Sequence, residues 1–146
     1  MMRKLVGLLQ CLCLVVGLLQ GCGDPPDPDI YFAEKTTYML IGGDPGAADR
    51  LDWDTLQFMG TNQGAQFMAL PSEGEKIGFK NPFINSVSAA FQAMKLDVNS
   101  LNNWRISTKG TWQTVVIADT PTQSKVLVTV SRRTGQPLIS AINRVT

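Results

Sequence analysis

The sequence predicts an α+β fold in which one main helix packs on a largely antiparallel sheet. Two observations lead to this prediction. The last third of the chain holds three segments rich in β-branched residues, and only short turns separate them. The middle of the chain holds one segment whose apolar residues recur every three or four positions. Short turns favour antiparallel pairing, and a helix with one apolar face needs a sheet or another helix to cover that face.

Three strands are expected at the C-terminus, at residues 111–119, 124–132 and 137–145. In the second of these, Val126, Val128 and Val130 alternate with residues that are mostly polar, so one face of the strand is apolar. Turns rich in Thr, Pro and Gly stand between the segments. The C-terminal part is therefore predicted to be a three-stranded meander.

The main helix is expected to begin at Asn81-Pro82 and to end near Lys95–Asp97. Asn is a favoured N-cap, and Pro is favoured at the first helical position. The apolar residues at helical spacing are Phe83, Val87, Ala90, Phe91 and Met94. We expect this face to pack on the valines of the sheet, including Val116.

Shorter elements are expected before this helix. Residues 36–43, TTYMLIGG, are rich in β-formers and end on a Gly pair, which favours a first strand. A short helix is expected within 44–60, after an Asp-Pro-Gly turn. A hairpin is expected from strands at 64–70 and 76–79 around the turn PSEGE.

Residues 1–21 have the layout of a secretory signal peptide. Met1 to Lys4 is positively charged, and Leu5 to Leu19 is apolar apart from one Gln. A membrane-spanning helix needs about 20 apolar residues, and this stretch is shorter. An uncleaved membrane anchor remains the alternative for this segment.

The end of the apolar stretch, Leu19-Gln20-Gly21-Cys22, resembles the lipobox of bacterial lipoprotein precursors. That family has Leu three residues before the cysteine and a small residue directly before it. The resemblance implies that the leader is removed before Cys22, that a diacylglycerol is attached to the Cys22 thiol, and that an acyl chain such as palmitate is added to the new amino terminus. Each buried methylene contributes about 0.8 kcal/mol, so two or three chains would hold the protein on a bilayer.

The residues after Cys22 bear on location. In this family an Asp directly after the cysteine favours retention in the inner membrane of enteric-type bacteria, whereas this chain has Gly23. The resemblance therefore implies an outer-membrane lipoprotein that faces the periplasm. An inner-membrane lipoprotein and a Gram-positive surface lipoprotein are the alternatives. Residues 22–29, with three Pro and three Asp after Gly23, are expected to be an extended tether, and residues 30–146 a single domain.

Composition narrows the function classes. The chain has no His, which is the most frequent general base and metal ligand. It lacks G-x-S-x-G and the glycine spacing of nucleotide-binding loops. A net charge of +1 gives no surplus of Lys and Arg for nucleic acid. We therefore expect a non-enzymatic protein with no cofactor, no metal and no nucleic-acid partner.

Few polar residues suggest a site. The acidic residues of one cluster are Asp44, Asp49, Asp52 and Asp54. They lack the central Gly and final Glu of a calcium loop, so a solvated helix start is the expected reading. Glu73 and Glu75 are expected in a solvated turn. Ser124 and Lys125 are neighbours on a strand, so their side chains should lie on opposite faces.

Aromatic residues offer a second kind of candidate site. The candidates for a ligand platform are Trp53, Trp104, Trp112, Tyr31, Phe32, Phe58 and Phe67. Aromatic side chains also fill cores, and that reading stays open. Arg132-Arg133, at a predicted hairpin tip, is expected to be a solvated turn.

Two functions follow from these observations. The first is a non-enzymatic accessory or protein-interaction module that serves an outer-membrane assembly, secretion or surface-structure system through an envelope protein partner. Its expected docking surfaces are sheet edges near Lys125–Arg132 and the turns at 72–76 and 132–136. The alternative is a lipoprotein that binds glycan, peptide or lipid in an aromatic groove.

Overall fold

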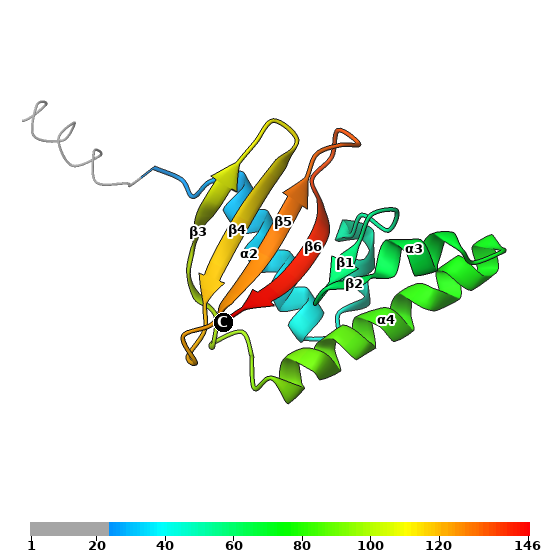
Figure 1. Cartoon of the computed structure of the whole chain (residues 1–146), viewed down its shortest axis with the longest axis horizontal. Coiled ribbons are helices and arrows are strands. Elements are labelled where there is room, and N and C mark those ends of the chain that lie inside the picture. The colour runs from blue at the N-terminus through cyan, green and yellow to red at the C-terminus, as the bar shows by residue number, and fades with distance from the viewer. Residues whose placement is uncertain (1–23) are drawn as a thin grey trace, which may run out of the picture.

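A computed structural model describes residues 24–146 of the chain. It confirms an α+β fold built on a six-stranded mixed sheet with the strand order β2-β1-β6-β5-β4-β3 (Figure 1). The helices are α2 (Pro28–Ile41), the 3₁₀ helix η1 (Pro45–Arg50), α3 (Gln63–Met68) and α4 (Glu73–Ala93). The strands are β1 (Gln57–Phe58), β2 (Thr61–Asn62), β3 (Asn102–Lys109), β4 (Gln113–Asp119), β5 (Lys125–Ser131) and β6 (Leu138–Val145).

The predicted C-terminal meander is confirmed, and β3 extends it by one strand. Strands β3 to β6 pair with their sequence neighbours in antiparallel fashion, while the short β1 pairs parallel to β6. The sequence prediction missed β3 because this edge strand has no buried side chain and its pairing with β4 has two irregularities in register. In β3 only Trp104 and Ile106 alternate with polar residues, and this pattern is too short to predict a strand.

Helix α2 stands where residues 36–43 were predicted to form a strand, so that prediction was wrong. Asp27 caps the helix by accepting a hydrogen bond from the Asp29 N–H, and Pro28 occupies the first turn. The hydroxyls of Thr36 and Thr37 donate to carbonyls one turn earlier, which satisfies two β-forming residues inside a helix. The N-cap at Asp27 and these hydroxyl contacts favour a helix in a segment whose residues have high β-propensity.

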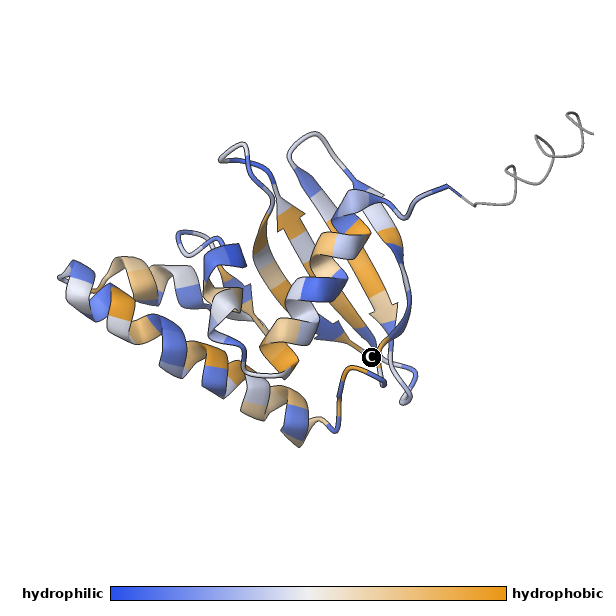
Figure 2. Ribbon diagram, turned by 180° about the vertical axis from the view of Figure 1, so that it is seen from behind, coloured by the Kyte–Doolittle hydropathy of each residue, from blue (hydrophilic) through white to orange (hydrophobic). Residues whose placement is uncertain are grey.

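The start of α2 also corrects the predicted domain boundary. Asp27 is the N-cap of the helix, Pro28 is its first residue, and Asp29 is buried against Thr114 of β4 and Arg132. The folded part of the chain thus includes the last three residues of the predicted tether. Seen from behind, α2 crosses one face of the sheet over β3, β4 and β5 (Figure 2).

Helix α4 begins nine residues before the predicted start at Asn81-Pro82. Ser72 is its N-cap and accepts from the Glu75 N–H over 3.2 Å, while the Ser72 hydroxyl donates to the Glu75 carboxylate over 2.7 Å. The Ser72-x-x-Glu75 spacing is that of a capping box, and this start places Pro82 inside the helix. The predicted hairpin of 64–70 and 76–79 was also wrong, because α3 and the first turns of α4 occupy it.

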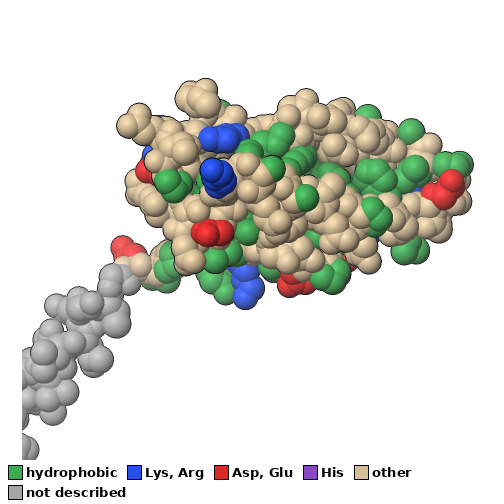
Figure 3. Space-filling view, turned by 90° about the horizontal axis from the view of Figure 1, so that it is seen from below, with side chains coloured by type: hydrophobic (Ala, Val, Ile, Leu, Met, Phe, Trp, Pro, Cys, Tyr) green, Lys and Arg blue, Asp and Glu red, His purple; other side chains and the backbone are tan. Residues whose placement is uncertain are grey.

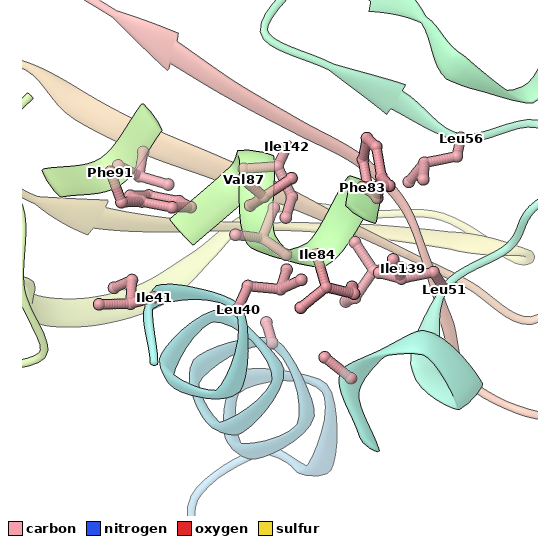
Figure 4. Close-up of a cluster of buried hydrophobic side chains, with 14 of the residues drawn as sticks. Leu40, Ile41, Leu51, Leu56, Phe83, Ile84, Val87, Phe91, Ile139 and Ile142 are labelled. Carbon is pink, nitrogen blue, oxygen red and sulfur yellow. The ribbon is translucent and has the colours of Figure 1, made fainter. Parts of the chain in front are cut away.

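The apolar face predicted for the main helix is largely correct, but its packing partner is not. Phe83, Val87 and Phe91 are buried, and they form one cluster with Leu40 of α2 and Ile142 of β6 (Figure 4). Helix α4 packs chiefly on α2 and η1, whereas α2 is the helix that covers the C-terminal strands. The sequence pattern identified the buried side of α4 without identifying what covers it.

Candidate functional site

One end of the sheet, which we call the hairpin end, gathers charged side chains from four parts of the chain. It consists of the β3–β4 turn (109–113), the β5–β6 turn (131–136), the first turn of α2 and the loop 51–55. Both ribbon views place the two hairpin tips at the end of the sheet where α2 begins (Figures 1 and 2). Four carboxylates there lie within ion-pair distance of three cations.

The innermost pair of the hairpin end joins Asp29 to Arg132. Asp29 is 3% exposed, and it accepts hydrogen bonds from the Arg132 guanidinium and, over 2.7 Å, from the Thr114 hydroxyl. A carboxylate in the first turn of a helix also lies at the positive end of the helix dipole. This contact fastens β4 and the β5–β6 hairpin to the start of α2.

The second pair joins Asp52 to Arg133. Asp52 is 4% exposed, and the Arg133 guanidinium donates to its two carboxylate oxygens over 3.2 and 3.3 Å. Asp54 lies 3.9 Å from the same guanidinium. Arg132 and Arg133 stand at the predicted hairpin turn with 39% and 53% of their side chains exposed, and in addition each arginine neutralises a buried carboxylate that the sequence did not indicate.

The third pair joins Asp27 to Lys109, at the point where the chain enters the fold. The Lys109 ammonium donates to Asp27 over 2.6 Å. This contact, helped by the Asp29 N–H, holds the pKa of Asp27 below its ordinary value. The same contact raises the pKa of Lys109. The pair ties the β3–β4 hairpin to the residue that caps α2.

An open groove of about 660 Å³ lies between the two hairpins. Its lining residues are Thr55, Gly110, Thr111, Trp112, Gln113, Ser131 and Arg133. The Trp112 side chain is 65% exposed, although its carbonyl accepts a hydrogen bond from the Arg132 N–H. The groove thus combines one free aromatic ring with hydroxyl, amide and guanidinium groups.

The other predicted aromatic candidates do not gather in this groove. Trp53 and Phe67 are buried in the core, and the residues packed against that core are Phe32, Phe58 and Trp104. The indole N–H of Trp53 donates to the Ala48 carbonyl over 2.8 Å, which satisfies its one donor. Of the seven, Trp112 and Tyr31 are the ones classed among the exposed large hydrophobic residues of the described chain.

A second surface, the α3–α4 groove, has a different character. It is an open hollow of about 640 Å³ lined by Gln63, Leu70, Glu75, Gly78, Phe79, Pro82, Phe83 and Ser86. Nearby in sequence, Ile77 is 69% exposed and Met68 is 52% exposed. Hydrophobic side chains interrupt a sparsely charged surface on this part of the molecule (Figure 3). Its walls are mainly apolar.

Gly78 and Pro82 of α4 both line the α3–α4 groove. Proline has no N–H, so the helical hydrogen bond that would end on the Gly78 carbonyl cannot form. A Cβ built on Gly78 would meet no atom within 4 Å, so there is open space at this point of the helix.

The remaining polar candidates have structural roles. Asp44 caps η1 and accepts from the Gly46 N–H, and Asp49 is exposed. Glu73 pairs with Lys76 in the first turn of α4, and the Glu75 carboxylate accepts from the Ser72 hydroxyl, so neither lies in a loop turn. Within residues 24–146, no three acidic or cysteine side chains are grouped as metal ligands.

Ser124 and Lys125 lie in different environments. Ser124 is buried in a hydroxyl network in the β4–β5 turn, where it contacts Thr120 over 2.7 Å and accepts from Arg144 over 2.9 Å. Lys125 is exposed. The network stabilises the turn and leaves Ser124 without a neighbouring amine.

Cys22 and the leader lie outside the described residues. No helix within residues 24–146 combines the length and the apolar character needed to cross a membrane. The chain matches no protein-family model, no curated protein and no solved structure.

Proposed function

We propose that the protein is a lipid-anchored envelope protein that acts as a non-enzymatic interaction module. Acyl chains on Cys22 would hold it on the outer membrane, facing the periplasm, and the α3–α4 groove would receive an apolar segment of an envelope protein partner. The proposal rests on two features, the lipobox-like sequence that ends at Cys22 and the mainly apolar α3–α4 groove.

The observation that carries the proposal is the chemistry of the α3–α4 groove. Phe79, Phe83 and Leu70 provide apolar walls. The polar lining residues are Gln63, Glu75 and Ser86. Grooves that take a peptide segment combine apolar walls with a few polar groups.

The docking surfaces expected from the sequence need revision. Residues Lys125–Arg132 belong largely to β5, which lies between β4 and β6 and offers no free edge. The segment 72–76 is the start of α4, so it contributes to the groove as helix. The turn at 132–136 does join two strands, but its arginines are engaged by buried carboxylates.

The alternative from the sequence, a binding groove for glycan, peptide or lipid made of aromatic side chains, stays a prediction. Trp112 in its groove is the observation in its favour. Because most of the aromatic candidates pack in or against the core, we favour the interaction module.

A photocrosslinking amino acid placed at Ser86, an exposed residue that lines the groove, tests the proposal in living cells. We expect it to capture one envelope protein in stoichiometric amount. The same reagent at Gln92, exposed on α4 but not among the groove residues, should capture none. Equal capture at both positions, or no capture at Ser86, would contradict the proposal.

A Gly78→Ala variant separates binding from folding. Alanine is favoured over glycine in a helix by up to about 1 kcal/mol, so the variant should be at least as stable as the parent. The added methyl group would occupy open space at the groove and should reduce crosslinking at Ser86. Unchanged crosslinking would show that the partner does not approach Gly78.

A further inference from the structure

We infer that the tip of the β3–β4 hairpin lies in the headgroup region of the bilayer that holds the lipid anchor. Trp112 is the residue whose side chain enters this region. This inference rests on the proposed acylation of Cys22. It assigns the hairpin end a role as a second contact with the membrane, separate from the α3–α4 groove.

The length of chain before the fold carries the first step. Four residues lie between Cys22 and Asp27, and the five extended steps from one Cα to the other span at most about 18 Å. Asp27 is itself fixed, because it caps α2 and pairs with Lys109 at the base of the β3–β4 turn. An anchored sulfur at Cys22 therefore keeps this hairpin close to the membrane surface.

The chemistry of the tip carries the second step. Trp112 lies only three residues after Lys109, and the Gly110 N–H closes the turn onto the Gln113 carbonyl over 2.8 Å. Its indole ring is largely exposed although the interior of the protein holds other aromatic side chains. Tryptophan prefers the membrane interface, where its apolar ring leaves water and its N–H still finds acceptors.

The charges of the hairpin end argue for insertion of the ring rather than electrostatic attraction. Lys109, Arg132 and Arg133 each pair with an aspartate, so the cations present no net positive surface to anionic lipids. Contacts made by basic residues weaken strongly with salt, whereas burial of an apolar ring does not. The contact should therefore persist at high ionic strength.

Fluorescence quenching by brominated lipid tests the inference on the native lipoprotein. The protein purified from the envelope is reconstituted in phosphatidylcholine vesicles whose acyl chains carry bromine near the headgroups. We expect quenching of tryptophan emission that is unchanged at high salt, that disappears in Trp112→Phe and that persists in Trp104→Phe, since Trp104 is half-buried against the core.

Three results would overturn the inference. Equal quenching of the parent and Trp112→Phe would place another tryptophan at the membrane, and loss of quenching at high salt would make the contact electrostatic. A Trp112 that ignores lipid but responds to a soluble N-acetylglucosamine oligosaccharide would make the groove a glycan site. Intact mass separates the two proposals: a protein without acyl chains removes the proposed anchor, whereas an acylated protein with unquenched Trp112 removes only this inference.

Discussion

At the scale of single residues, paired carboxylates hold the hairpin end together. Asp29 and Asp52 are buried, and each is neutralised by one of two consecutive arginines. Among the described residues, no buried side-chain nitrogen or oxygen lacks a hydrogen-bond partner. A buried charge without its partner is costly, so these pairs should matter for stability beyond what surface ion pairs contribute.

Arg132→Ala should lower the free energy of unfolding by about 2 kcal/mol. Removal of one partner of a buried pair costs about 3–5 kcal/mol, and the partial exposure of Arg132 reduces that cost. Urea unfolding measures the change. Asp29→Asn combined with Arg132→Met should recover part of the loss, because no charge is then left buried. An Arg132→Ala loss no larger than that of Arg105→Ala, which breaks a surface pair with Asp119, would contradict this account.

Stability should fall as the pH falls below about 4. The pKa of Asp27 is lowered by Lys109, and the pKa of Asp119 is lowered by Arg105 and Asn103. A carboxyl group whose pKa is lower in the folded state stabilises the fold above its unfolded pKa, and this contribution is lost as the pH falls through its folded pKa.

Asp27→Asn isolates the part of this effect that Asp27 contributes. Asn caps a helix about as well as Asp, so α2 keeps its cap while the charge facing Lys109 is removed. The urea midpoint of the variant should change less between pH 5 and pH 3 than that of the parent. An identical change in both proteins would show that the Asp27–Lys109 pair does not contribute.

At the scale of elements, the sequence predicted those whose burial follows a simple period. Strands β4 and β5 alternate buried and less buried residues along their length, and this pattern is visible in the sequence. Helix α2 was missed because Thr36, Thr37 and Ile41 favour strands, and its cap was read as part of a proline-rich tether. The N-cap at Asp27 and the packing of α2 on the sheet outweighed the β-propensity of these residues.

The start of α4 shows how two capping signals compete. Asn81-Pro82 and Ser72-x-x-Glu75 both resemble helix starts, and the structure uses the second. Ser72→Ala should therefore lower the free energy of unfolding by about 1 kcal/mol. Asn81→Ala, inside the helix, should have little effect or be slightly stabilising. A larger loss for Asn81→Ala would place the helix start at the later signal.

At the scale of the whole molecule, the candidate sites depend on contacts between distant residues. Arg132 lies 103 positions from Asp29, and Arg133 lies 81 positions from Asp52. No local pattern indicates such partners, so the sequence could name Arg132, Arg133 and Trp112 as candidates but could not bring them together. The α3–α4 groove was hidden for a related reason, since its two walls were predicted to be a hairpin.

The fold arranges these surfaces around one point of attachment. The hairpin end lies where the chain enters α2, and the helices α3 and α4, which line the groove, lie beyond β1 and β2 (Figure 1). A lipid on Cys22 would hold the first surface at the membrane and leave the second facing the periplasm. Both proposals therefore depend on the sulfur of Cys22.

The intact mass of the protein purified from its native membrane tests this dependence most directly. The account predicts a chain that begins at Cys22 and carries a thioether-linked diacylglycerol, and a Cys22→Ser variant that is neither processed nor acylated. A native protein that begins at Met1 with an unmodified Cys22 thiol would contradict it.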